Sequence, residues 1–246
     1  MKAVVLIPAR YSSSRYPGKP LVPLLGKPMI IWVAELASKA VGRDNVYVAT
    51  EDIRISKVVA QAGFNFVMTT DSCLTGTDRL AEAAEQIDAD IYINVQGDEP
   101  VVNPEDIEKA IEIKKKDMSL IVNGYCWLSE SEDPNSVNIP KVITTEDDVL
   151  VYMSRSALPG YKDQRNAPKA YKKQVCIYAF NADELKMYKS FGRKSELEFS
   201  EDIEILRFLE FGNRIQMFET TAGSLAVDVP DDVAPVEKAL KELHQL

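Results

Sequence analysis

Apolar runs and amphipathic segments alternate along the first half of this chain, and their order limits the fold more than any other feature. The apolar runs are short and rich in branched and aromatic side chains, as in buried strands, and cover residues 4–7, 46–50, 64–68 and 90–95. The segments between them have apolar residues at helical spacing, over 28–41, 52–62, 77–87 and 104–116, the last with Asn103 as its cap. This alternation predicts an α/β fold with a mostly parallel central sheet and helices on both faces.

The second half of the chain is less regular. Strands are predicted over 118–125, 140–144, 149–153, 175–180 and 215–218, and helices over 182–188, 201–210 and 230–243. Residues 145–148 are typical of a hairpin turn between two of these strands. No shift in composition marks a linker. We therefore predict one domain over residues 1–246, in which the stretch from roughly 120 to 200 holds a small hairpin-rich lobe suited to a dimer surface.

The composition indicates an acidic protein of a reducing compartment. Its 29 Lys and Arg face 38 Asp and Glu, a formal charge of −9, which argues against general affinity for nucleic acid or an anionic membrane. Cys73, Cys126 and Cys176 are odd in number and widely spaced, unlike a disulfide framework. No apolar run approaches the ~20 residues of a membrane span, and the N-terminus lacks the pattern of a signal peptide. We expect a cytoplasmic protein with no nucleic-acid or membrane partner.

A basic loop follows the first apolar run directly, although the chain is otherwise acidic. It carries Arg10, Arg15 and Lys19 together with Ser13 and Gly18. Clustered cations repel one another and gain nothing from a core, so we interpret the loop as a binding site for a polyanion such as a chain of phosphates. A solvated basic loop is the alternative interpretation. The spacing matches neither a P-loop nor a G-x-G-x-x-G dinucleotide motif.

Single carboxylates follow two other apolar runs. Asp98 lies in the sequence N-V-Q-G-D-E-P and Asp228 in A-V-D-V-P. Carboxylates opposite phosphates are natural Mg²⁺ ligands, whereas a Gly-Asp turn and a helix cap are the simpler explanations of these two residues. The single histidine, His244, argues against Ser-His or Cys-His catalysis and against a His-rich metal site. Carboxylates, cations and a hard metal ion together indicate phosphoryl or nucleotidyl transfer.

Two more polar segments follow predicted strands. Thr50 and Asp52 are typical caps of the helix that comes next. In the sequence T-G-T-D-R, which covers residues 75–79, Thr77 is predicted to cap a helix. The functional alternative is that backbone amides and Arg79 hold a base edge or a phosphate.

Eight segments of the chain resemble the 3-deoxy-manno-octulosonate (Kdo) cytidylyltransferases and, more distantly, the acylneuraminate cytidylyltransferases. In chain order they are IPARYSSSRYPGKPL, GKPMI, VAT, GTDR, NVQGDEP, YMSRSALP, IEILR and AVDVP, and they span essentially the whole sequence. The resemblance implies a Rossmann-like nucleotidyltransferase fold and a homodimer. It also implies transfer of CMP from CTP to the anomeric hydroxyl of an acidic sugar, with release of diphosphate, for lipopolysaccharide or capsule synthesis.

The resemblance further implies roles for the residues at matching positions. Arg10, Lys19 and Asp98 are expected to be catalytic, and Asp98 and Asp228 to bind Mg²⁺. The expected CTP site comprises Arg10, Ser13, Arg15, Lys19, Ala49, Thr50, Gly76, Thr77, Asp78 and Arg79. The expected contacts of the acidic sugar are Gln96, Arg155, Gln174, Tyr178, Glu204 and Ile205. In such a site Mg²⁺ and the cations stabilise the charge that develops as the sugar hydroxyl attacks the α-phosphorus.

Three positions depart from the family pattern where the sugar is expected. Gln174 and Cys176 stand where the family has His and Gly in K-H-x-G-I-Y, and Ile205 stands where it has Gln in E-Q-L-R. Either other residues recognise the same sugar, or the acceptor is a modified acidic sugar such as 8-amino-Kdo. A uridylyl- or guanylyltransferase for a sugar phosphate and a nucleotide-binding regulatory protein without turnover are the alternative classes.

Overall fold

The computed structural model describes residues 1–12, 16–221 and 225–245. Its centre is a sheet whose main path runs in the order β11-β7-β10-β6-β1-β4-β5. These strands are β1 (Ala3–Ala9), β4 (Val46–Thr50), β5 (Asn65–Met68), β6 (Ile91–Val95), β7 (Ile121–Trp127), β10 (Lys172–Phe180) and β11 (Ile215–Glu219). β1 pairs in parallel with β4 and β6, β4 with β5, and β11 with β7, whereas β10 is antiparallel to both of its neighbours on this path. The predicted mostly parallel sheet is confirmed.

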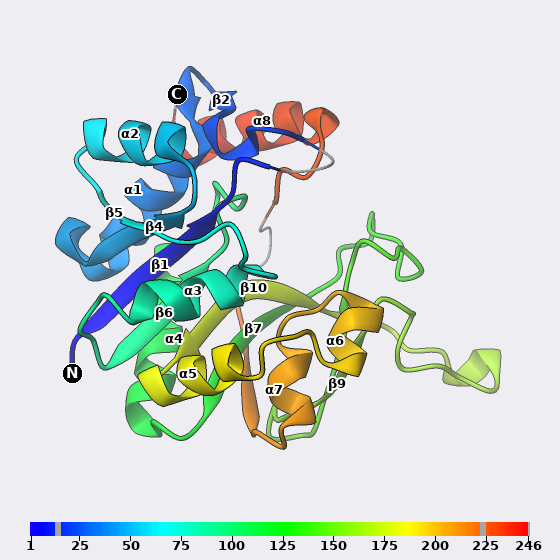
Figure 1. Ribbon diagram of the computed structural model, residues 1–246. Coiled ribbons are helices and arrows are strands. Elements are labelled where there is room, and N and C mark those ends of the chain that lie inside the picture. The colour runs from blue at the N-terminus through cyan, green and yellow to red at the C-terminus, as the bar shows by residue number, and fades with distance from the viewer. Residues whose placement is uncertain (13–15, 222–224, 246) are drawn as a thin grey trace.

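Helices cover both faces of the sheet (Figure 1). One core cluster joins the sheet to α1 (Met29–Val41), α2 (Ile53–Gln61) and α4 (Pro104–Lys116), and another joins it to α3 (Gly76–Ala84), α5 (Ala182–Ser190) and α7 (Leu206–Glu210). Val5 and Ile7 of β1 belong to the first cluster and Val4 and Leu6 to the second. The unbroken apolar run at the start of the chain follows from this, because successive side chains of a strand point to opposite faces and both faces are buried.

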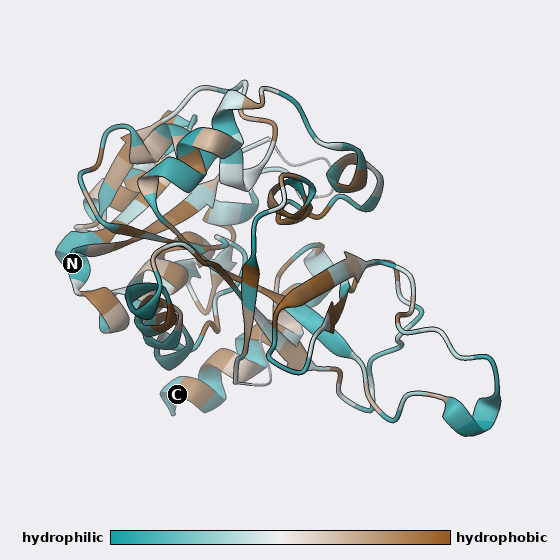
Figure 2. Ribbon diagram, turned by 90° about the horizontal axis from the view of Figure 1, so that it is seen from below, coloured by the Kyte–Doolittle hydropathy of each residue, from teal (hydrophilic) through white to brown (hydrophobic). Residues whose placement is uncertain are grey.

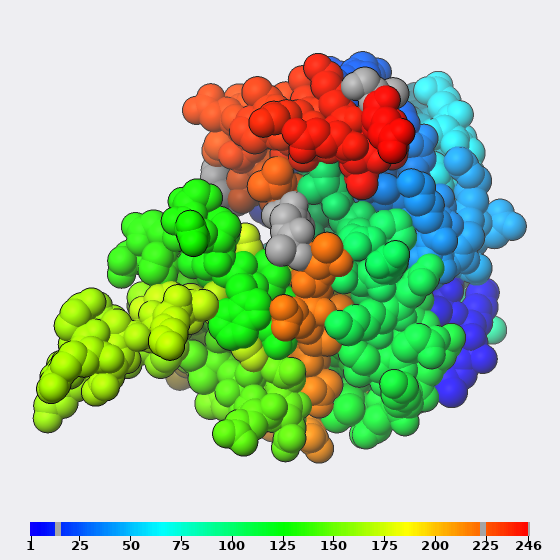
Figure 3. Space-filling view, turned by 180° about the vertical axis from the view of Figure 1, so that it is seen from behind, coloured from blue at the N-terminus to red at the C-terminus, as the bar shows by residue number. Residues whose placement is uncertain are grey.

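A lobe is attached beside the second half of the sheet. Its hairpin of β8 (Lys141–Thr144) and β9 (Leu150–Ser154) joins the sheet where β8 pairs with the first residues of β10. Residues 155–171 form an arm with one 3₁₀ turn, η3 (Gln164–Asn166). The arm extends away from the body of the molecule and is mostly hydrophilic (Figures 2 and 3).

The C-terminal helix α8 (Val233–His244) packs beside the start of α1. A third core cluster joins Val236 and Leu240 of α8 to Leu24 and Trp32. Leu24 belongs to a two-stranded ribbon of β2 (Pro23–Leu24) and β3 (Lys27–Pro28). Within the part of the chain that the structure describes, none of the helices has the length and apolarity that crossing a membrane requires.

Three predictions about local structure are wrong. The helix predicted over 201–210 is two helices, α6 (Glu196–Glu201) and α7, because Asp202 adopts a left-handed conformation with φ 51° that ends α6. The helix predicted from residue 230 begins at Val233, after the 3₁₀ turn η4 (Pro230–Asp232). Thr75, not Thr77, caps α3, since its side chain accepts the hydrogen bond of the Asp78 amide.

Other boundaries agree with the predictions or shift slightly. α4 covers the predicted residues, and Asn103 caps it by accepting the Glu105 amide. Asp52 caps α2 in the same way by accepting the Arg54 amide. β7 begins three residues later than predicted, because Asp117 accepts the Ser119 amide and holds residues 117–120 in a turn.

Candidate active site

Two adjoining cavities open beyond the carboxyl ends of β1 and β6. The inner cavity has a volume of about 310 Å³ and is lined by residues that include Arg10, Lys19 and Arg79. The outer cavity is larger, about 950 Å³, and extends over β10 to the lobe. Both are lined by Arg10, Gln96, Asp98, Asp202, Glu204 and Asp228. The position agrees with the general rule that open α/β sheets bind ligands at the carboxyl ends of their strands.

Lys19 lies between the two predicted metal ligands. Its Nζ atom is 2.6 Å from Asp98 Oδ2 and 3.2 Å from Asp228 Oδ1. The structure thus brings together three residues that are far apart in the sequence. Gly18 favours this placement, because its left-handed conformation, with φ 72°, turns the basic loop directly before Lys19 begins the 3₁₀ turn η1 (Lys19–Leu21).

The backbone around Asp98 is closely packed against β1. A Cβ atom on Gly97 would lie 2.9 Å from the carbonyl oxygen of Pro8, which is closer than real Cβ contacts. Only glycine therefore lets the chain turn here and direct Asp98 to the end of the sheet. The Asp98 carbonyl accepts the Val227 amide at 2.9 Å, which holds the segment before Asp228 beside it.

The two aspartates fit a hard divalent cation of the Mg²⁺ type. Mg²⁺ commonly takes one or two carboxylates and completes its octahedral shell with phosphate oxygens and water. Asp98 and Asp228 offer that number of ligands. The described residues contain no group of three or more His, Cys, Asp or Glu side chains that could hold a metal ion by themselves. The Lys19 ammonium lies 2.6 and 3.2 Å from the two carboxylates, so positive charge is stabilised beside this pair.

The basic loop is closed at its base by Tyr11, a residue that the sequence analysis missed. The Tyr11 carbonyl accepts the Gly18 amide at 2.9 Å, and the Tyr11 amide donates to Glu51 Oε1 at 2.9 Å. Arg54 lies over the Tyr11 ring at 3.2 Å from its centroid. Arg10 is exposed at the mouth of both cavities. The predicted residues Ser13 and Arg15 lie outside the described residues.

Glu204 occupies the N-terminus of α3. Its carboxylate accepts the amides of Gly76 and Thr77 at 2.9 and 2.8 Å and the Thr77 hydroxyl at 2.6 Å. Burial raises the pKa of Glu204, and these hydrogen bonds partly oppose the rise. Glu204 therefore links the predicted nucleotide residues Gly76 and Thr77 to the predicted sugar residues, and it lines both cavities.

Arg79 lines the inner cavity, but its guanidinium is bound to Thr69 and Glu51. Its Nη1 atom donates to Thr69 Oγ1 at 2.5 Å and is 3.0 Å from Glu51 Oε2. Ala49 and Thr50 are buried at the end of β4, and neither is among the described residues that line the two cavities.

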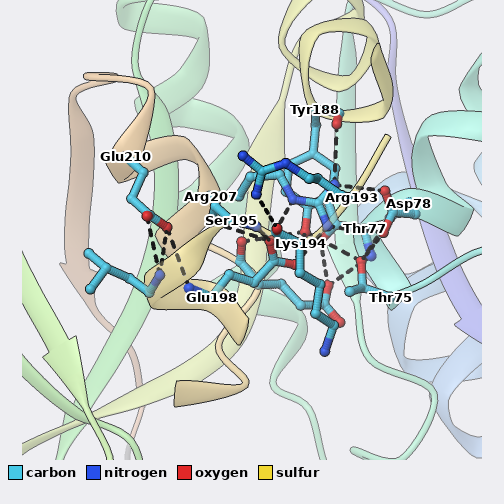
Figure 4. A network of polar contacts seen from close by, with 12 residues as sticks. Thr75, Thr77, Asp78, Tyr188, Arg193, Lys194, Ser195, Glu198, Arg207 and Glu210 are labelled. Atoms are coloured by element: carbon cyan, nitrogen blue, oxygen red, sulfur yellow. Dashed lines mark hydrogen bonds and ion pairs between the residues drawn. The ribbon is translucent and has the colours of Figure 1, made fainter. Parts of the chain in front are cut away.

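The structure places Asp78 in a buried ion network and not at either cavity surface, within the part of the chain that it describes (Figure 4). Arg207 Nη1 is 2.8 Å from Asp78 Oδ1, and Arg207 Nε and Nη2 are 2.6 and 2.7 Å from the two Glu198 oxygens. The Tyr188 hydroxyl donates to Glu198 at 3.0 Å. This network joins α7 and α6 to the start of α3, where Thr75 and Gly76 line the inner cavity.

The expected sugar residues divide into three groups. Gln96, Gln174, Tyr178 and Glu204 line the outer cavity. Arg155 also lines it, but its guanidinium donates to the backbone carbonyls of Val137 and Asp202 at 2.8 and 3.0 Å. Ile205 is 1% exposed and belongs to the core under α7 and, among the described residues, it is not part of either cavity lining.

Lys194 is a further cation that the sequence analysis missed. It lines the inner cavity, and its Nζ atom is 2.6 Å from Asp202 Oδ1. Asp202 is the left-handed residue at which the predicted helix breaks, and it lines the cavity beside Lys194. The local sequence around Lys194 offers no signal of this placement.

Comparisons with known proteins agree with this geometry. A family model described as cytidylyltransferase matches residues 4–215. The 3-deoxy-manno-octulosonate cytidylyltransferase of Escherichia coli is 42% identical over 233 residues, which cover 93% of this chain and 92% of that protein. The 8-amino-3,8-dideoxy-manno-octulosonate cytidylyltransferase of Shewanella oneidensis is 37% identical over 248 residues, which cover 98% and 99% of the two chains.

A solved structure is similar over the same length. A CMP:2-keto-3-deoxy-manno-octonic acid synthetase complexed with CTP superposes with a TM-score of 0.90 at 38% identity, covering 99% of this chain and all of that one. This confirms the Rossmann-like nucleotidyltransferase fold. The chain belongs to the cytidylyltransferase family.

Proposed function

We propose that this protein transfers CMP from CTP to the anomeric hydroxyl of Kdo or a closely related acidic sugar and releases diphosphate. The observation that carries the proposal is the meeting of Lys19, Asp98 and Asp228 beside Arg10, at the sheet edge where nucleotides bind. The whole-length similarity to Kdo and 8-amino-Kdo cytidylyltransferases supports the choice of CTP and of the sugar class.

Arg10 and Lys19 bind the phosphates in this proposal. The oxygen of the sugar hydroxyl forms a bond to the α-phosphorus and gives up its proton to solvent, while the bond to the diphosphate breaks and negative charge grows on the leaving oxygens. The ammonium of Lys19 stabilises that charge because two carboxylates hold it at the cavity surface, and the guanidinium of Arg10, which lines the same cavity, adds to the stabilisation. Gln96 and Glu204 lie between the two cavities and orient the acceptor relative to the nucleotide.

Diphosphate release tests the proposal directly. With CTP and a Kdo-class acceptor we expect release that needs both substrates, and UTP or GTP should give rates lower by at least about 100-fold, since a base-specific site leaves polar groups unpaired with the wrong base. Release with a sugar phosphate and UTP or GTP, but not with CTP, would contradict it in favour of another sugar nucleotidyltransferase.

Asp98 and Asp228 are proposed to hold Mg²⁺ together with the phosphates of CTP. The bound ion would neutralise phosphate charge and orient the chain of phosphates. We expect Asp98→Asn to weaken Mg²⁺-dependent CTP binding, measured by calorimetry with and without EDTA, and to lower kcat by about 100-fold or more. Asp231→Asn is the matched control, because Asp231 is exposed and lies outside both cavity linings within the described part of the chain. Equal binding by Asp98→Asn and wild type would contradict the metal assignment.

A homodimer in the cytoplasm, in a pathway to lipopolysaccharide or capsule, completes the proposal. Large apolar side chains are exposed on the lobe, among them Val137, Val151 and Phe199 at 65%, 52% and 74%, and such exposure favours an interface. All three cysteines lie in the described part and are unpaired, which favours a reducing compartment. Sedimentation equilibrium that gives the mass of one chain at micromolar concentration would contradict the dimer.

A further inference from the structure

Lys194 and Asp202 lie at the two ends of one short helix. Lys194 comes two residues before α6, and Asp202 ends α6 in its left-handed conformation. Their side chains meet at the inner cavity, which both residues line, with Lys194 Nζ 2.6 Å from Asp202 Oδ1. The ion pair therefore joins the two ends of α6 at the cavity wall.

The backbone on both sides of this pair is fixed by other contacts. Ser195 is buried, and its amide donates to Glu198 Oε2 at 3.1 Å, while Glu198 is bound to Arg207 in the buried network (Figure 4). At the other end of α6, the Asp202 carbonyl accepts from Arg155 Nη2 at 3.0 Å. The two side chains can therefore change partners without moving α6.

The two members of the pair differ in exposure. The Asp202 side chain is 74% exposed, whereas the Lys194 side chain is 26% exposed. Water solvates an exposed charge well, so such a pair contributes little to stability. Asp202 stays solvated when the pair breaks, while the less exposed Lys194 needs another anionic partner.

Two other cations of the inner cavity are held more firmly than Lys194. Lys19 lies between Asp98 and Asp228, and Arg79 is paired with Glu51. The side chains of these three carboxylates are between 15% and 42% exposed. Because water screens the attraction of the more exposed Asp202, an arriving anion displaces the partner of Lys194 more easily than the partners of Lys19 and Arg79.

Asp202 also lies in the field of Arg10. The pKa of Asp202 is lowered, chiefly by the hydrogen bond from Lys194 and further by the charges of Lys194, Arg155 and Arg10, while burial opposes the change. The positive charge of Arg10 therefore acts on the same part of the cavity as that of Lys194. An anion that Arg10 binds there repels Asp202 and attracts Lys194.

We propose that Lys194 is a further phosphate-binding residue: when CTP enters the inner cavity, the Lys194 ammonium leaves Asp202 and binds a phosphate oxygen of the nucleotide. The inference rests on the proposed binding of CTP and adds a residue to it. Hydrogen bonds between an ammonium and a phosphate are charge-assisted and roughly twice as strong as neutral ones. Among the described residues Lys194 lines the inner cavity and not the outer one, which favours the nucleotide over the sugar carboxylate as its ligand.

Calorimetric titration with CTP and Mg²⁺, without an acceptor sugar, tests this exchange. We expect Lys194→Met to raise the Kd of CTP by about tenfold, and Lys194→Arg, which keeps the charge, to restore part of the affinity. Asp202→Asn should act in the opposite direction and lower the Kd severalfold, because it removes the anion that competes with phosphate. Asparagine also adopts the left-handed conformation readily, so α6 still ends at residue 202.

Lys189→Met is the matched control. Lys189 pairs with Glu85 at 2.8 Å and, in the described chain, lies outside both cavity linings, so the Kd of CTP should stay at the wild-type value. Urea unfolding should give Lys194→Met and Asp202→Asn nearly wild-type stability, since an exposed ion pair contributes little. In steady-state assays Lys194→Met should raise KM for CTP and leave KM for the acceptor unchanged.

The outcomes separate the inference from the proposed function. A wild-type protein that binds no CTP contradicts the proposed function itself. If wild type binds CTP and Lys194→Met binds it equally well, the inference is overturned and the function stands. Weaker or equal binding by Asp202→Asn also overturns it, as does an effect of Lys194→Met confined to KM for the acceptor. If Lys194→Met does not fold, the Kd of Asp202→Asn still decides the question.

Discussion

The ammonium group of Lys19 lies within hydrogen-bond distance of two carboxylates that are 79 and 209 residues away in sequence. Without a cation, two such carboxylates at one cavity would repel each other. Lys19 is therefore placed to bind phosphate and to lower the cost of having both aspartates ionised.

We predict that Lys19→Met lowers kcat/KM for CTP by about 100-fold or more, the usual effect of removing one donor that stabilises transition-state charge. Steady-state diphosphate release measures it. Lys27→Met serves as control, since Lys27 pairs with Glu35 and lies outside both cavity linings of the described residues. A Lys19→Met enzyme as fast as the control would contradict the role of Lys19.

Glu201 provides a prediction for pH. Burial tends to raise its pKa, but hydrogen bonds from the Arg155 amide, the Ser154 hydroxyl and the Tyr152 hydroxyl lower it below the ordinary value of 4.5. A lowered pKa in the folded state means that the ionised carboxylate stabilises the fold above about pH 4.5 and that this contribution disappears as the pH falls through the folded-state pKa.

We accordingly expect Glu201→Gln to lower the free energy of unfolding by about 1–2 kcal/mol at pH 7, and by progressively less as the pH falls below about 4.5. Urea unfolding at a series of pH values measures this. Glu146→Gln, at an exposed position of the β8–β9 turn, should show no such trend. A difference between Glu201→Gln and wild type that grows in acid would contradict the assignment.

At the scale of elements, the local sequence pattern predicted some helices well and failed where tertiary contacts decide the structure. Helices with a strong apolar period and a side-chain cap, such as α4 with Asn103, could be predicted closely because their signals lie within a few residues. The break between α6 and α7 could not. It depends on the left-handed Asp202, whose carbonyl accepts from Arg155 and whose carboxylate pairs with Lys194.

Gly124 of β7 is also constrained by a residue far away in the sequence. A Cβ atom at this position would lie 2.8 Å from Thr220 Cγ2, and Thr220 is buried and donates to the Tyr125 carbonyl. We expect Gly124→Ala to lower the free energy of unfolding by about 1–3 kcal/mol, because the core cannot move aside.

The double variant Gly124→Ala/Thr220→Ser removes the clashing methyl group and keeps the hydroxyl, so it should recover most of the loss. Urea unfolding measures both variants, with Gly160→Ala as control, since a Cβ atom there meets nothing within 4 Å. A double variant less stable than Gly124→Ala would show that the Thr220 methyl group is not the cause.

At the scale of the molecule, the cavities join segments from both halves of the chain, so ligand binding should stabilise the whole fold. A ligand at 100 times its Kd adds about 2.7 kcal/mol, which corresponds to roughly 5–10 °C in Tm for a chain of this size. We predict that CTP with Mg²⁺ raises Tm by about this amount.

Differential scanning calorimetry with CTP and Mg²⁺, with CTP and EDTA, and with GTP and Mg²⁺ checks this. The EDTA and GTP samples should give much smaller shifts. Equal shifts with CTP and GTP would contradict a cytidine-specific site, and equal shifts with Mg²⁺ and EDTA would contradict a metal-assisted one.

The sequence by itself determined the class of fold, because alternating apolar runs are a local signal. It also determined the basic loop and the pair of aspartates, because polar residues that follow strands meet at one edge of a parallel sheet. Only the tertiary structure decided which side chains face the cavities. Asp78 matches a family motif and Ile205 stands at a position where the family has Gln, yet Arg207 binds Asp78 in a buried network and the core encloses Ile205. The orientation of the Gln174 amide likewise depends on Asn123, 51 residues away, whose Oδ1 atom accepts a hydrogen bond from Gln174 Nε2. Such an orientation depends on partners that only folding brings together.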